Sequence, residues 1–115
     1  EVPRLAAEGI GLCDAMAAGL ESSDYERGCP LATLALETTA TSDRLAAACA
    51  DGFDRWLASI ARGLERDGHA PEDARELAVL VLSALEGALI LARAARDTAP
   101  LHSVGARLRP ILDRS

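Results

Sequence analysis

The stretch ELAVLVLSALEGALILARAARD (Glu76–Asp97) is the part of the sequence that decides the fold. From Leu77 to Ala92 nearly every residue is apolar or small, and Glu86 is the one carboxylate in these sixteen residues. A helix that is apolar on all sides must be covered on all sides, by lipid or by protein. Sixteen residues fall short of the roughly 20 that cross a bilayer, and a central Glu is costly in lipid. The sequence therefore favours a protein cover.

The composition predicts that the whole chain is helical. Half of the 115 residues are hydrophobic, with one Phe, one Trp and one Tyr, and most of the apolar residues are Ala and Leu. Both are strong helix formers, and the length suits one domain. No strand pattern or internal repeat is present. We expect an all-α fold of five helices, at about Pro3–Leu20, Pro30–Thr38, Asp43–Asp67, Pro71–Arg96 and from Pro100 to the kink or stop expected at Pro110.

The third of these segments has the clearest boundaries. Ser42 is placed to cap its start, and Gly68 suits the position just past its end. Its apolar residues recur at steps of three and four, which predicts one buried stripe. The stripe consists of Leu45, Cys49, Phe53, Trp56, Ile60 and Leu64.

Charge, cysteine and histidine usage exclude several classes of protein. The net charge is −6, all 12 basic residues are Arg, and none forms a basic run, so this chain by itself is a poor nucleic-acid binder. The cysteines form no CxxC pair and the two histidines stand alone, which indicates neither a metal site nor a disulfide framework. We expect that the chain binds no cofactor, is not an enzyme and is located in the cytoplasm. We also expect His69 and His102 to lie at the surface.

The long apolar helix has more than one apolar side, and this predicts a dimer. One side can pack on the domain's own core, and a second copy of the chain is the simplest cover for the other. The last two helices of each chain would form an intermolecular four-helix bundle. Glu86 would either pair with an Arg such as Arg93 across the interface or lie at its wet edge, and both alternatives stay open. The expected interface residues are Leu82, Glu86, Leu89, Ile90, Arg93, Leu101, Val104 and Leu108.

Three stretches together resemble the C-terminal half of TetR/AcrR-type bacterial transcriptional regulators. They are GCPLATLALE (Gly28–Glu37), SDRLAAACADGFDRWLASIARGLERDG (Ser42–Gly68) and ALEGALILARAARDTAPL (Ala84–Leu101). Their order and spacing are more specific than any one of them. The resemblance implies an all-α regulatory domain that dimerises through its last two helices and encloses a small-molecule pocket. A ligand in that pocket would release the full-length protein from operator DNA.

The resemblance further implies that residues 1–115 are this regulatory domain without its N-terminal helix-turn-helix domain. The chain begins Glu1-Val2-Pro3 without Met, which predicts a fragment of a longer protein. Carried over by position, the pocket candidates are Cys13, Met16, Leu34, Phe53, Trp56, Leu57, Ile60 and Leu85. Each of them could instead fill the core, which leaves a homodimerisation scaffold without a ligand as the alternative function.

Overall fold

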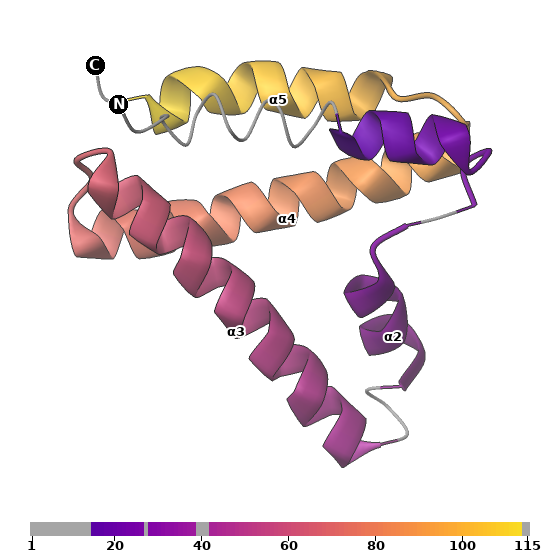
Figure 1. The fold of residues 1–115 in the computed structure, drawn as a ribbon, viewed down its shortest axis with the longest axis horizontal. Coiled ribbons are helices and arrows are strands. Elements are labelled where there is room, and N and C mark those ends of the chain that lie inside the picture. The colour runs from indigo at the N-terminus through magenta and orange to yellow at the C-terminus, as the bar shows by residue number, and fades with distance from the viewer. Residues whose placement is uncertain (1–14, 27, 39–41, 114–115) are drawn as a thin grey trace.

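The computed structural model describes residues 15–26, 28–38 and 42–113, and these are almost entirely helical. Residues 15–22 are helical, and they are followed by α2 (Pro30–Thr38), α3 (Asp43–Arg66), α4 (Pro71–Ala95) and α5 (Ala99–Leu112). No strand occurs within these ranges, so the predicted all-α fold is confirmed. Residues 3–14 of the predicted first helix lie outside the described residues. Figure 1 shows α5 lying antiparallel along α4, while α3 crosses near the start of α4.

The ends of α3 are set by the residues that the sequence indicated. The Ser42 hydroxyl accepts a hydrogen bond from the Leu45 N–H at 3.2 Å, which satisfies one of the free donors of the first turn. At the other end, Gly68 has φ +106°, and the His69 N–H donates to the Leu64 carbonyl at 3.1 Å. This is the backbone pattern that commonly ends a helix at glycine.

His69 is buried, which shows that the expected surface position was wrong. Its side chain is 8% exposed, and Nε2 lies 2.9 Å from the carbonyl oxygen of Leu112. The imidazole therefore ties the α3–α4 loop to the end of α5. Because α5 continues past Pro110 to Leu112, that carbonyl is within reach. His102 is exposed, as expected.

The core forms around α4, which packs against α3 and against α5. Two groups of buried residues lie along it, one toward its start and one toward its end. The first group consists of Leu64, Ala74, Val81, Leu85, Leu108 and Leu112. The second consists of Ala17, Leu20, Ala88, Leu89, Ala92 and Leu101. Met16 and Val104 pack against both groups and join them into a continuous core.

Within the described chain, α4 is the one helix long and apolar enough to cross a membrane by length and composition. The core helix of a soluble protein meets the same criterion, and neighbouring helices cover two sides of α4 here. A third side remains open, where Val79, Leu80, Ile90 and Leu91 are exposed. These four residues lie within about 120° of one another around the helix axis, so they form one mostly apolar face, which also includes the exposed Ser83 and Glu76.

A strained cluster joins the turn after residues 15–22 to the end of α4. Within the described ranges, the non-glycine residues with positive φ are Asp24, Tyr25 and Arg96. The Arg96 guanidinium pairs with the Asp24 carboxylate and lies 5.3 Å from the centre of the Tyr25 ring. Arg93 Nε also donates to the Tyr25 carbonyl at 3.2 Å. These contacts offset the cost of the left-handed backbone at all three residues.

Substitutions at Arg96 separate the free-energy cost of its left-handed backbone from the stabilisation by its side-chain contacts. Both Arg96→Gly and Arg96→Ala lose the contacts to Asp24 and Tyr25, but only glycine adopts φ 53° without strain. We expect the glycine variant to be more stable than the alanine variant by about 1 kcal/mol in urea unfolding. At Arg62, an exposed position inside α3, the same pair should show the opposite order. Equal stability of the two Arg96 variants would contradict this account.

Candidate functional site

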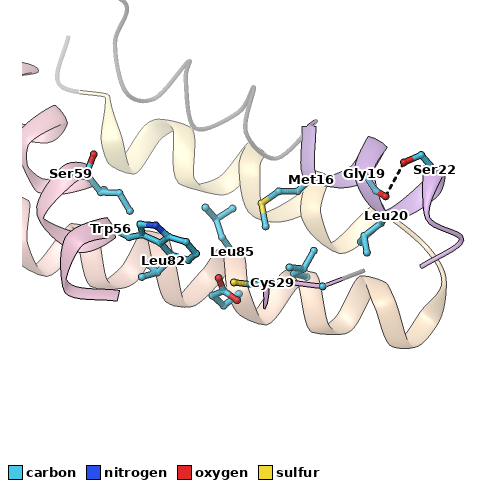
Figure 2. A pocket seen from close by; sticks show the side chains of 13 residues that line it. Met16, Gly19, Leu20, Ser22, Cys29, Trp56, Ser59, Leu82 and Leu85 are labelled. Atoms are coloured by element: carbon cyan, nitrogen blue, oxygen red, sulfur yellow. Dashed lines mark hydrogen bonds between the residues drawn. The ribbon is translucent and has the colours of Figure 1, made fainter. Parts of the chain in front are cut away.

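A cavity of about 530 Å³ lies between residues 15–22, the segment before α2, and helices α3 and α4 (Figure 2). Its volume falls within the range of small-molecule sites, which are mostly apolar clefts of about 300–1,000 Å³. The wall is mainly apolar and consists of Met16, Gly19, Leu20, Ser22, Gly28, Cys29, Trp56, Ser59, Ile60, Leu82, Leu85, Glu86 and Leu89.

The structure brings four of the pocket candidates together on this wall. They are Met16, Trp56, Ile60 and Leu85. In Figure 2, Met16 reaches in from residues 15–22 and Trp56 from α3, with Leu85 of α4 between them. Trp56 is the one tryptophan of the chain. Its fluorescence therefore reports directly on the contents of the cavity.

Three other candidates do not line the cavity, and Cys13 lies outside the described residues. Leu34 is exposed on α2, and Leu57 is half-buried on α3. Phe53 is an edge-to-face neighbour of Trp56, with ring centres 5.8 Å apart, so it supports the wall from behind. The stripe on α3 continues toward its first residue, where α3 diverges from α4 (Figure 1). Of this stripe, Trp56 and Ile60 therefore line the cavity, while Leu64 lies in the buried core.

Sequence reasoning predicted Leu85 but missed the rest of the contribution of α4 to the wall. Leu82, Glu86 and Leu89 were expected at a dimer interface, yet they line the cavity together with Leu85. Their numbers follow the spacing i, i+3, i+4, i+7, which places them on one face of a helix. That spacing was visible in the sequence. The small and polar wall residues carried no comparable signal; they are Gly19, Ser22, Gly28, Cys29 and Ser59.

Several residues expected at the dimer interface are covered by the chain's own helices. Leu101 is 0% exposed, Leu89 and Leu108 are buried, and Val104 packs against both parts of the core. Ile90 is exposed, and so is Arg93. The short α4–α5 connection turns the apolar stripe of α5 toward its own α4. The surface left for a second copy therefore includes Ile90 but none of the buried residues.

Cys29 and Glu86 are neighbouring polar residues of the wall, which also holds the hydrogen bond from the Ser22 hydroxyl to the Gly19 carbonyl at 3.1 Å (Figure 2). Burial raises the pKa of the Cys29 thiol above its ordinary value of 9.0, the Ala32 N–H opposes this, and a hydrogen bond to Glu86 adds to it. The Cys29 thiol therefore stays protonated near neutral pH. Because the thiolate is the nucleophilic form, Cys29 is a polar wall group rather than a reactive one.

An all-α domain with an apolar cavity against its central helix is the arrangement of the regulatory half of TetR-type transcriptional regulators. Residues 6–107 match the family described as "Transcriptional regulator LmrA/YxaF-like, C-terminal domain", and the chain belongs to this family. The expected resemblance is thereby confirmed.

The relatives are transcriptional regulators of the helix-turn-helix type. The chain is 43% identical to the uncharacterized HTH-type transcriptional regulator Rv0196 of Mycobacterium tuberculosis over 98 residues, which cover 81% of this chain and 50% of that protein. It is 33% identical to the uncharacterized HTH-type transcriptional regulator YxaF of Bacillus subtilis over 98 residues, which cover 85% of this chain and 51% of that protein. It is 28% identical to LmrA of the same species over 87 residues, which cover 76% of this chain and 46% of that protein. The chain thus spans about half the length of the relatives it matches.

The Cys29–Glu86 contact predicts slow alkylation of Cys29. In a Cys13→Ser, Cys49→Ala background, the pH midpoint of the reaction with iodoacetamide should lie above that of a free thiol. Glu86→Gln should lower this midpoint, because the carboxylate is one of the groups that raise the pKa of Cys29. Glu76→Gln, an exposed change on the same helix, should leave it in place. A midpoint indifferent to Glu86 would refute the contact.

Proposed function

We propose that this chain is the effector-sensing and dimerisation domain of a TetR-type transcriptional regulator, located in the cytoplasm. A small, mostly apolar molecule occupies the cavity, and its binding releases the full-length protein from operator DNA. The observation that carries the proposal is the 530 Å³ apolar cavity within a domain of this family. A homodimerisation scaffold with a filled core is the alternative, and an open cavity of this size argues against it.

The composition of the wall suggests how binding is communicated. Met16, Gly19 and Leu20 belong to residues 15–22, while Leu85 and Leu89 belong to α4. A ligand between these two elements sets the distance between them. In the family pattern the DNA-binding domain precedes this one, so a shift of residues 15–22 against α4 would change the spacing of two DNA-binding domains in a dimer. Such a shift requires two arrangements of these elements, of which the ligand binds one more tightly than the other.

The proposed dimer surface is the open face of α4. Val79, Leu80, Ile90 and Leu91 are exposed there, and Ile111 of α5 is exposed as well. Gly87 lies among the α4 residues, and a Cβ at this position would meet no atom of the chain within 4 Å. A glycine inside an apolar helical face allows a second helix to approach closely. A two-fold axis through this face would use each of these residues twice.

A larger side chain at Gly19 tests ligand binding. A Cβ at Gly19 meets nothing within 4 Å, and the residue lines the cavity, so Gly19→Leu fills space without a clash at its base. The neutral dye Nile red should bind the wild-type chain and change the fluorescence of Trp56. Gly19→Leu should weaken binding by about tenfold or more, which is about 1.4 kcal/mol. Gly19→Ala is the matched control and should bind much like the wild type. Equal affinity for the Leu and Ala variants would place the dye elsewhere.

A charge on the open face of α4 tests dimerisation. Leu91 is 62% exposed, so Leu91→Asp should leave the fold intact while placing two carboxylates at the two-fold interface. We expect a monomer by light scattering at tens of micromolar, where the wild type is a dimer. Leu45→Asp is the control, since Leu45 is exposed in the first turn of α3, and this end of α3 lies away from α4 (Figure 1). A monomeric wild type, or a dimeric Leu91→Asp, would contradict the proposed surface.

A further inference from the structure

We infer that the effector is an organic cation with an apolar body, and that the Glu86 carboxylate binds its positive group. The inference rests on the proposed function, because it assigns a chemical class to the ligand of the same cavity. It starts from the charges on the wall. Glu86 is the one formally charged residue among the described lining residues, and none of the others is Arg or His. An anionic ligand would meet a like charge with no compensating cation.

Glu86 lacks a positive partner within the part of the chain that the structure describes. Its contact is the Cys29 thiol, which is a neutral donor. Arg93 follows two turns later on α4, roughly 10 Å further along the axis. Its Nε donates to the Tyr25 carbonyl, and its guanidinium lies against Gly28, where a Cβ would be 3.2 Å from a terminal nitrogen. Arg93 lines a smaller neighbouring pocket together with Cys29 and Glu86, but it is not part of the wall of the main cavity.

Ligand entry changes the solvation of this carboxylate. A neutral apolar molecule in the cavity would displace water from Glu86 and leave the charge without a partner, which is costly. A ligand ammonium group would replace that water with a charge-assisted hydrogen bond. The cavity therefore favours the cation over a neutral molecule of the same shape.

Two further features favour a cation. Trp56 lines the same cavity from α3, and an indole face attracts a cation that lies within about 6 Å of it. Ile60, Leu82 and Leu89 supply the apolar wall for the rest of the molecule. The chain also carries a net charge of −6, which raises the local concentration of cations and opposes the approach of anions.

A matched series of probes tests the inference. The probes are naphthalenes with one short alkyl chain that ends in an ammonium, a hydroxyl or a carboxylate group. Binding is measured by titration calorimetry and by Trp56 fluorescence. The ammonium probe should bind the wild type about tenfold more tightly than the alcohol, as expected for a hydrogen bond to a charged group, and the carboxylate should bind most weakly.

Variants at Glu86 assign the preference to the carboxylate. Glu86→Gln should reduce ammonium binding by about tenfold and change alcohol binding little, whereas Glu86→Asp should retain a preference for the ammonium probe. Glu76→Gln removes an exposed charge from the same helix and should alter neither. Circular dichroism establishes that each variant is folded.

The outcomes separate this inference from the proposed function. If alcohol and ammonium bind equally, or if Glu86→Gln retains the preference in a folded chain, the cation assignment is wrong while the sensing function stands. If Nile red and all three naphthalene probes fail to bind and Trp56 fluorescence never changes, the cavity holds no ligand of this kind. That result would overturn both and favour the scaffold.

Discussion

The fold depends on the need to cover α4. This helix exposes apolar side chains in nearly every direction, and no single neighbour can shield a full turn of a helix. α3 and α5 each cover one sector, and residues 15–22 close over its second half. Two sectors stay incompletely covered. One faces the cavity through Leu82, Glu86 and Leu89, and the other is the open face with Leu80 and Leu91. Both proposed activities of the domain occupy surfaces that the chain leaves uncovered on this one helix.

Local signals in the sequence were sufficient to predict the helices. A helix end depends on a few neighbouring residues, so Ser42, Gly68 and Pro71 indicated the boundaries of α3 and α4 before any packing was known. The burial of Cys49 and Leu64 followed from the same periodicity. Where an interaction is contained within about four residues, the sequence alone is sufficient to predict it.

The rotation of α4 and the position of the cavity depended on longer-range packing. Periodicity shows that a helix is apolar on several sides, but it does not show which neighbour covers which side. Leu101 and Leu108 form the same stripe whether they face their own α4 or a second chain, and the length of the α4–α5 connection decides between the two. His69 is a similar case, because its partner is a backbone carbonyl 43 residues away. No local pattern encodes a cavity, since it is the space that remains where α3 diverges from α4.

The cluster of Asp24, Tyr25 and Arg96 has a consequence for the cavity rim. The cluster lies at two helix ends, where the Tyr25 N–H donates to the Leu20 carbonyl at 2.7 Å and the Asp97 N–H donates to the Ala92 carbonyl at 3.0 Å. Ser22 and Gly28 flank it along the chain and belong to the cavity wall. The Asp24–Arg96 ion pair and the hydrogen bond from Arg93 Nε to the Tyr25 carbonyl therefore attach this part of the cavity wall to the end of α4.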